Sequence, residues 1–197
     1  VMGKLMSCLF VVLLSIQNVY GGDNPVTCSD NQEALLIDNK QGNLNSFIAQ
    51  HNFVATGEST FSLLFWDLYK SKLMTTTGDY PISINDEKLI FCIEYLTDIK
   101  SKDLIERTIE QWQHIGLKES EYQKYVITLE AIWPNIKEGD SLALLMQKEK
   151  SVFYFNDKYL GTIDDPNFGQ MFIDIWLSKN TSQPSLREEL LGEQTNE

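Results

Sequence analysis

Side chains able to catalyse a reaction are scarce in this chain, and their spacing is unfavourable. His51 and His114 are the only histidines, so a zinc site would need carboxylates or thiols at unusual spacing. The run Gly57-Glu-Ser-Thr-Phe61 begins like the turn that carries a nucleophilic serine, but it lacks the second glycine, and no strand-to-helix turn is expected there. We therefore expect neither a metal site nor serine hydrolysis.

Two further arrangements have a simple structural interpretation. The glycines are scattered singly between the expected elements, so no glycine-rich loop is available to bind phosphate, and we expect no cofactor. Asp164 and Asp165 form a carboxylate pair. We interpret this pair as the cap of the following helix rather than as a general acid and base.

Composition and charge restrict the class of protein. The chain has 197 residues, of which 43% are hydrophobic and 11% aromatic, as expected for one folded domain. Its formal net charge of −12 repels phosphate backbones, and its two arginines, Arg107 and Arg187, cannot form a guanidinium cluster. Nucleic acid is therefore not an expected partner.

Residues 1–21 are expected to be an export signal. Lys4 precedes an apolar run over residues 8–16, which is too short to span a bilayer comfortably. Val19 and Gly21 are small enough for the positions three and one before a cleavage site. We expect cleavage after Gly21, a periplasmic or secreted protein and no stable membrane span afterwards, with an uncleaved anchor as the alternative.

Cys28 and Cys92 remain once this leader is removed, and in an oxidising compartment they could form one bridge. We favour the alternative without a bridge. Cys92 lies in a strand-like run over residues 89–96, where a thiol usually serves as a small buried apolar group. Cys28 lies in a polar segment, predicted over residues 22–50 and expected to be partly flexible.

The remaining sequence predicts a folded body over residues 51–192 and a disordered tail over 193–197. A short strand over 52–56 is followed by a turn at Gly57 and by a long strand over 60–74. Further strands are predicted over residues 88–96, 141–147, 152–155 and 159–163.

Three helices complete the predicted body. The first begins with Ser101 as N-cap, the second ends before Pro134, and the third has Asp165 as N-cap with Pro166 at its first position. Each has one apolar stripe to bury. These elements predict an α+β domain in which the helices cover one face of an antiparallel sheet.

Several short motifs, in order, resemble the chalcone isomerase-like family, specifically its short exported bacterial branch, from residue 53 to residue 192. They are Leu64-Phe-Trp-Asp-Leu-Tyr69, Tyr95-Leu-Thr-Asp98, Ile105-Glu-Arg-Thr-Ile-Glu110, Ile136-Lys-Glu-Gly-Asp140, Phe153-Tyr-Phe-Asn156 with Gly161, Phe172-Ile-Asp-Ile-Trp-Leu177 and Leu190-Leu-Gly192. The resemblance implies an open-faced β-sandwich, a large antiparallel sheet with helices on one face. It also implies a cleft between the two layers that holds an apolar ligand, as in the plant enzymes and in fatty-acid-binding relatives.

The chain departs from the enzymes of this family at the groups that stabilise the enolate. The resemblance implies an arginine shortly after the glycine turn and a tyrosine early in the first helix. Thr60 or Ser62 stands in place of the arginine, and Leu104 in place of the tyrosine. Threonine donates one neutral hydrogen bond and leucine none, so chalcone isomerase activity is not expected.

We therefore expect an exported protein without chalcone isomerase activity that binds a lipophilic ligand such as a fatty acid. The candidate ligand-binding residues are Thr60, Trp66, Tyr69, Leu104, Arg107, Gln111, Trp112 and Trp176. The tryptophans could equally be plain core residues. Arg107 could hold a ligand carboxylate or pair with Asp67 or Asp98. The alternatives are an isomerase or intramolecular lyase acting on an unknown substrate, and a protein-interaction module of the cell envelope.

Overall fold

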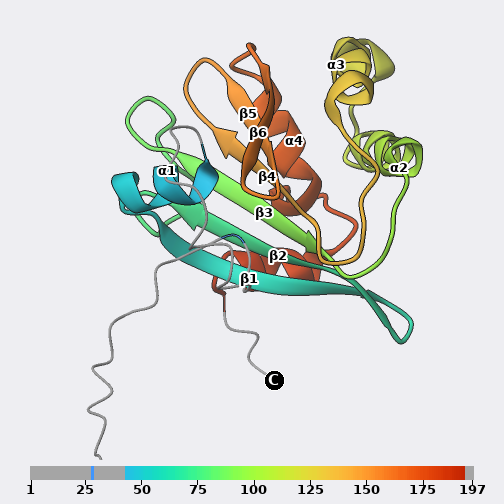
Figure 1. The fold of residues 1–197 in the computed structure, drawn as a ribbon, viewed down its shortest axis with the longest axis horizontal. Coiled ribbons are helices and arrows are strands. Elements are labelled where there is room, and N and C mark those ends of the chain that lie inside the picture. Colours follow the sequence, from blue (N-terminus) through green and yellow to red (C-terminus); the bar gives the residue numbers. More distant parts are fainter. Residues whose placement is uncertain (1–27, 29–42, 194–197) are drawn as a thin grey trace, which may run out of the picture.

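The computed structural model describes residue 28 and residues 43–193 (Figure 1). The predicted leader, most of the predicted polar segment and the end of the predicted tail lie outside these residues. In chain order the elements are α1 Leu44–His51, β1 Val54–Leu63, β2 Trp66–Thr75, β3 Leu89–Tyr95, α2 Ser101–His114, α3 Glu119–Ile132, β4 Ser141–Met146, β5 Ser151–Phe155, β6 Lys158–Ile163, α4 Phe168–Leu177 and α5 Pro184–Leu190.

One antiparallel sheet organises these elements. Its six strands follow the order β1-β2-β3-β4-β5-β6, so each strand pairs with its neighbours in sequence. Because side chains alternate between the two faces of a strand, each register row of the sheet belongs to one face. The predicted α+β class, with helices over a large antiparallel sheet, is confirmed.

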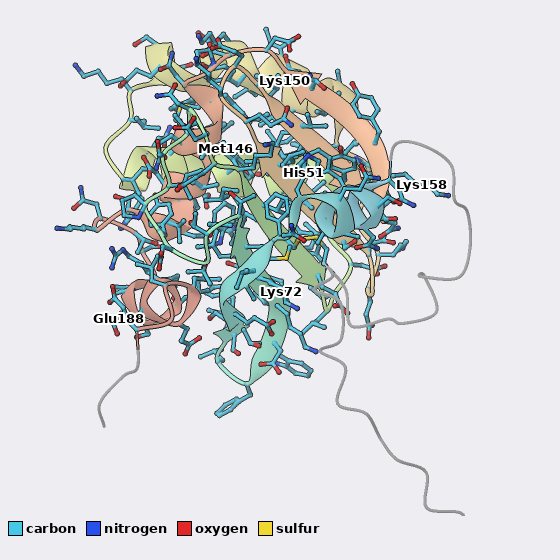
Figure 2. All side chains as sticks on the ribbon, turned by 90° about the vertical axis from the view of Figure 1, so that its left-hand side faces the viewer. His51, Lys72, Met146, Lys150, Lys158 and Glu188 are labelled. Carbon is cyan, nitrogen blue, oxygen red and sulfur yellow. A yellow bond between two sulfur atoms is a disulfide. The ribbon has the colours of Figure 1, made fainter. Side chains whose placement is uncertain are left out.

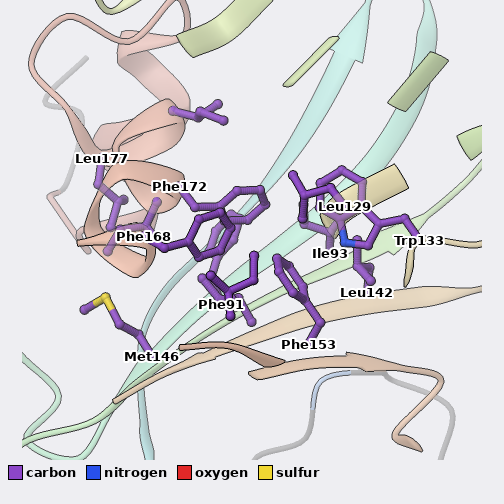
Figure 3. Packing of buried hydrophobic residues seen from close by; sticks show 14 of the residues in the cluster. Phe91, Ile93, Leu129, Trp133, Leu142, Met146, Phe153, Phe168, Phe172 and Leu177 are labelled. Atoms are coloured by element: carbon purple, nitrogen blue, oxygen red, sulfur yellow. The ribbon is translucent and has the colours of Figure 1, made fainter. Parts of the chain in front are cut away.

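The main hydrophobic core lies between the sheet and the helices. Leu73, Phe91, Leu144 and Phe153 are register partners across β2 to β5 and are all buried. Figure 3 shows aromatic rings of α4 packed over this row, and the Phe153 and Phe172 ring centroids are 5.5 Å apart. Burying one such side chain contributes about 1.5–3 kcal/mol, so this layer anchors α2, α3 and α4.

A second, smaller core lies on the opposite face. Met74, Ile90 and Leu145 form a buried register row there, and Leu44 and Ile48 of α1 belong to the same cluster. All of this helix except His51 lies within residues 22–50, which were expected to be polar and partly flexible. The difference arises because its few apolar residues are too irregularly spaced to reveal the buried face before the sheet is known.

The same face carries a disulfide, contrary to the expectation of a free thiol at Cys92. Cys28 and Cys92 are bonded, with Cα atoms 5.5 Å apart, and Figure 2 shows the bond in yellow against the sheet. Cys92 is buried as predicted, but its side chain lies on the face of the small core and is bonded to Cys28. The bond ties Cys28 to β3, in the middle of the sheet.

The first two strands are divided differently from the prediction. Strand β1 continues through Gly57, and the turn of the β1–β2 hairpin lies at Leu64 and Phe65. Gly57 lies at a register irregularity, where a Cβ atom would be 2.6 Å from the carbonyl oxygen of Leu190 in α5. Glycine is therefore needed for the close approach of α5 and not for a turn.

The predicted helices are confirmed, but two N-caps are wrong. The N-cap of α2 is Lys100, and Ser101 instead donates a hydrogen bond from its Oγ to the carbonyl oxygen of Trp133 at 2.9 Å. The N-cap of α4 is Asn167 and not Asp165. Asp165 lies two residues earlier and accepts a hydrogen bond from the backbone N–H of Asn167 at 2.9 Å.

Asp165 connects α3 to the loop that precedes α4. Its Oδ2 accepts hydrogen bonds from Lys124 Nζ and from Tyr125 Oη, each at 2.7 Å. The Lys124 ammonium group, the amide of Asn167 and the Tyr125 hydroxyl hold the pKa of Asp165 well below its usual value. This carboxylate is thus a structural contact and not an acid or base.

Removal of the disulfide should destabilise the protein without changing its core. Because the bond joins residues 64 positions apart, Cys28→Ser should lower the free energy of unfolding by about 2–4 kcal/mol under oxidising conditions. Chemical denaturation with and without a reducing agent measures this difference. Reduction should bring the wild type to the level of the variant, and a wild type unaffected by reduction would contradict the expectation.

Candidate functional site

The structure distributes the predicted ligand-binding residues over different environments. Some lie in or beside the main core, one lies on the other face of the sheet, and others point into solvent. Those in or beside the main core are Tyr69, Leu104, Gln111, Trp112 and Trp176. The remaining predicted residues, Thr60, Trp66 and Arg107, are exposed.

Trp112 is a core residue. Its side chain is fully buried, and its indole N–H donates to the carbonyl oxygen of Met171 in α4 at 3.1 Å. Its ring stacks on Tyr122 of α3, with centroids 5.3 Å apart. The expected hollow between sheet and helices is filled at this depth by side chains, because Trp112 joins three helices there.

Tyr69 and Trp176 form a polar contact at the border of this core. The indole N–H of Trp176 donates to the Tyr69 hydroxyl oxygen at 3.0 Å. The Trp176 ring lies 4.6 Å from that of Phe91, and the Tyr69 ring lies 5.1 Å from Phe61 and 6.3 Å from Tyr95. We call these five residues the Tyr69 cluster. It combines an apolar wall, buried at Phe91 and Tyr95 and half-buried at its other three residues, with the hydroxyl groups of Tyr69 and Tyr95.

The Tyr69 cluster keeps its phenols neutral. Burial raises the pKa of Tyr69 to about 12, although the hydrogen bond from Trp176 acts in the opposite direction. Burial also raises the pKa of Tyr95, and the neighbouring Tyr69 raises it further. Since the Tyr69 oxygen accepts from Trp176, its own proton can be donated to a ligand oxygen. The cluster can thus serve as a hydrogen-bond donor, and not as a phenolate base, at neutral pH.

Two of the other predicted residues on α2, Leu104 and Gln111, have structural contacts. Leu104 is half-buried against the main core and offers no donor. Gln111 accepts a hydrogen bond at its Oε1 from Ser182 Oγ at 2.7 Å, which links α2 to the segment before α5. Their predicted roles toward a ligand rest on the resemblance alone.

Arg107 makes neither of the two contacts expected within the protein. Its side chain is 77% exposed, and its guanidinium pairs with Glu110 one turn later, at 2.6 Å. Asp67 instead accepts a hydrogen bond from Ser62, and Asp98 pairs with Lys137, each at 2.6 Å. The apolar stripe of α2 faces the core, and Arg107 lies on the opposite, solvent-facing side.

Thr60 belongs to a polar groove on the face that carries the disulfide. This hollow has a volume of about 390 Å³ and is lined by both cysteines and by charged side chains, including Lys70, Lys72, Glu58 and Glu94. Lys72 pairs with Glu58 at 2.8 Å. This groove could have been predicted from Lys70 and Lys72, because residues two apart in a strand lie on the same face of a sheet. The charged side chains suit the groove to hydrophilic groups.

The part of the chain that the structure describes contains neither a candidate metal site nor a candidate membrane-spanning helix. Over residue 28 and residues 43–193, no group of three or more histidine, cysteine, aspartate or glutamate side chains could hold a metal ion. Within the same residues, none of the helices has the length and apolar character needed to cross a bilayer.

Comparison with known proteins identifies the family of this chain and a solved structure with a similar fold. An uncharacterized protein of Haemophilus influenzae is 27% identical over 125 residues, which are 64% of this chain and 61% of that protein. The chain therefore spans less than two thirds of that relative's length. A crystal structure of a fatty-acid-binding protein of Arabidopsis thaliana superposes with a TM-score of 0.54 and 11% identity, over 71% of this chain and 86% of that one. Residues 48–192 match the chalcone isomerase-like family, and the chain belongs to that family.

Proposed function

We propose that this protein binds a lipophilic carboxylic acid, such as a fatty acid, and has no chalcone isomerase activity. The family and the fold it shares with a fatty-acid-binding protein support this proposal. The observation that carries it is the Tyr69–Trp176 contact, which places a protonated hydroxyl at the border of an apolar interior. A carboxylate beside an apolar chain needs this combination.

The binding mode follows from how tightly the interior is packed. Trp112, Phe153 and Phe168 are fully buried, so a chain laid deep between the layers would have to displace them at a cost of several kcal/mol. Phe61 and Tyr69 are half-buried and can move at lower cost. The ligand therefore lies along the border of the core, with its carboxylate at the Tyr69 hydroxyl and its chain against the rings of the Tyr69 cluster.

The arrangement gives little support to enolate chemistry. Leu104 supplies no hydrogen bond, Thr60 faces the polar groove, and Arg107 points into solvent. Within the Tyr69 cluster the hydroxyls of Tyr69 and Tyr95 are neutral donors, and neither carries the positive charge of the arginine that the family resemblance implies for stabilising an oxyanion. An isomerase or intramolecular lyase would have to use these neutral phenols.

We also propose that the protein acts in an oxidising compartment outside the cytoplasm. Two observations support this location. The leader predicted over residues 1–21 would export the chain, and the Cys28–Cys92 disulfide is of a kind that persists where thiols are not kept reduced.

Loss of the Tyr69 hydroxyl should weaken fatty-acid binding. Since a hydrogen bond to a charged group contributes about 1.5–3 kcal/mol, Tyr69→Phe should raise the Kd for palmitate by roughly tenfold or more. Displacement of a fluorescent fatty acid measures this. Binding of the methyl ester should change much less, because the ester carries no charge.

Arg107→Ala is the matched control for a cationic contact. It removes the exposed guanidinium on α2 and should leave palmitate binding unchanged. The proposal fails if the wild type binds no fatty acid, or if Arg107→Ala weakens binding while Tyr69→Phe does not.

The raised pKa of Tyr69 should appear in the pH dependence of stability. An unfolded phenol titrates near pH 10, whereas folded Tyr69 titrates near 12. The retained proton stabilises the folded state fully below pH 10, and this contribution is lost as the pH rises from 10 through about 12. Tyr69→Phe should therefore lessen the fall in the free energy of unfolding over this range, by on the order of 2 kcal/mol.

Urea denaturation at several alkaline pH values measures this slope. Tyr159→Phe, which removes the hydroxyl of an exposed tyrosine, is the matched control. Equal slopes for the wild type and Tyr69→Phe would show that the Tyr69 hydroxyl is not buried as described.

A further inference from the structure

The end of the β1–β2 hairpin is an exposed apolar surface. We call residues 63–66 the hairpin tip. Leu63 is 58% exposed, Leu64 85%, Phe65 96% and Trp66 72%. Figure 1 shows the two strands extending past the neighbouring helices, so that the tip projects from the body. Scattered exposed apolar residues are common on proteins, but four in succession at a protrusion call for an explanation.

The turn at this tip has a leucine in a backbone conformation that glycine or asparagine adopts more easily. Leu63 and Trp66 are register partners, which leaves Leu64 and Phe65 as a two-residue turn. Leu64 has a φ of 58°, in the left-handed region that glycine or asparagine adopts most easily. Leucine is costly in this conformation by about 1 kcal/mol or more. A strained apolar residue that is also fully exposed indicates that its side chain is needed in contact with something outside the chain.

The form of the tip favours a lipid bilayer over a protein partner. A stable protein interface buries roughly 800 Å² on each side, which four residues at the end of a hairpin cannot supply. A narrow protrusion can instead enter the outer zone of a bilayer, where tryptophan and phenylalanine are favoured beside leucine. The strands pair up to Leu63 and Trp66, so few backbone groups at the tip would lose hydrogen bonds on insertion.

Charge indicates which lipid surface is suitable. The formal net charge of −12 opposes approach to anionic headgroups. Near the tip, Asp67 accepts a hydrogen bond from Ser62, which keeps this carboxylate on the strand behind the apolar residues. A zwitterionic surface has no net charge and therefore does not repel the protein. Its acyl chains still provide an apolar region for the tip.

We propose that the hairpin tip inserts into the interfacial zone of a zwitterionic phospholipid bilayer, and that the protein exchanges its lipophilic ligand there. The second half of this inference rests on the proposed function. The next register pair toward the body after Asp67 is Phe61 with Tyr69, and both belong to the Tyr69 cluster. A molecule leaving the bilayer beside the tip would thus meet the aromatic wall of the candidate site first.

Flotation with phosphatidylcholine vesicles tests the insertion. The full chain should float with the vesicles, and the double variant Leu64→Asn with Phe65→Gly should bind roughly tenfold or more weakly, because two exposed apolar side chains are lost. Asparagine and glycine suit a two-residue hairpin turn, so this variant should fold at least as well as the wild type. Ile127→Ser removes a similarly exposed side chain, 69% exposed on α3, and should float like the wild type.

Trp66 reports the position of the tip directly. Trp112 and Trp133 are buried, whereas Trp66 is exposed, so vesicles should shift Trp66 emission to shorter wavelength. Vesicles containing brominated phosphatidylcholine should quench this emission, and Trp66→Phe should abolish most of the quenching. Because every variant keeps the same N-terminus, differences between them report the tip and not the predicted leader.

Two outcomes would overturn the inference. One is a Trp66 that brominated vesicles do not quench, and the other is equal flotation of the wild type and the double variant. Palmitate binding in solution is measured separately, and the double variant should retain it. A failure of palmitate binding with intact vesicle insertion would overturn the proposed function and the exchange of ligand at the bilayer, but not the insertion of the tip. Palmitate binding without vesicle insertion would overturn the inference and leave the proposed function standing.

Discussion

The structure depends on covering the row of apolar side chains that β2 to β5 present to the helices. Leu73, Phe91, Leu144 and Phe153 lie side by side in register, and only rings and branched side chains from the helices can exclude water from them. Phe172 of α4 and Trp133, just after α3, both contact Phe153. The loops between these elements, the Asp165 contacts and the close approach of α5 at Gly57 all serve to hold the helices over this row.

Tight packing of this layer decides where function can be located. Because the centre is filled by side chains such as Trp112, the proposed ligand site lies at the edge of the core, where Phe61 and Tyr69 are only partly buried. The Tyr69 cluster lies at that edge and supplies a neutral hydroxyl. The opposite face has its own small core under α1, and beyond it a charged groove beside the disulfide. The two faces thus differ in the chemistry they offer.

The predictable part of the fold is the part that has a regular pattern. The stripes of α2 and α3 and the strands β3 to β6 were readable because apolar residues recur at the period of each element. The hairpin was missed since its turn consists of Leu64 and Phe65, which carry none of the usual turn residues. The disulfide was missed because the apolar run around Cys92 predicts only that this residue is buried. It does not reveal that Cys28 lies next to it.

The candidate site was less predictable, because side-chain direction depends on register and not on residue type. Thr60 and Tyr69 are both on the hairpin, but they face opposite sides of the sheet, and irregularities in β1 decide which. Trp112 and Trp176 lie on apolar helix stripes of similar appearance, yet only Trp176 reaches a hydroxyl group on the sheet. Arg107 was a reasonable candidate by charge, and its position on α2 turns it toward solvent.

The location of a bound ligand tests this account most directly. Nuclear magnetic resonance of the protein with ¹³C-labelled palmitate can detect contacts between the ligand methylene next to the carboxylate and individual side chains. The account predicts contacts with the rings of Tyr69 and Trp176. Contacts with Lys70 and Lys72 in the groove on the other face, without any to the Tyr69 cluster, would contradict it.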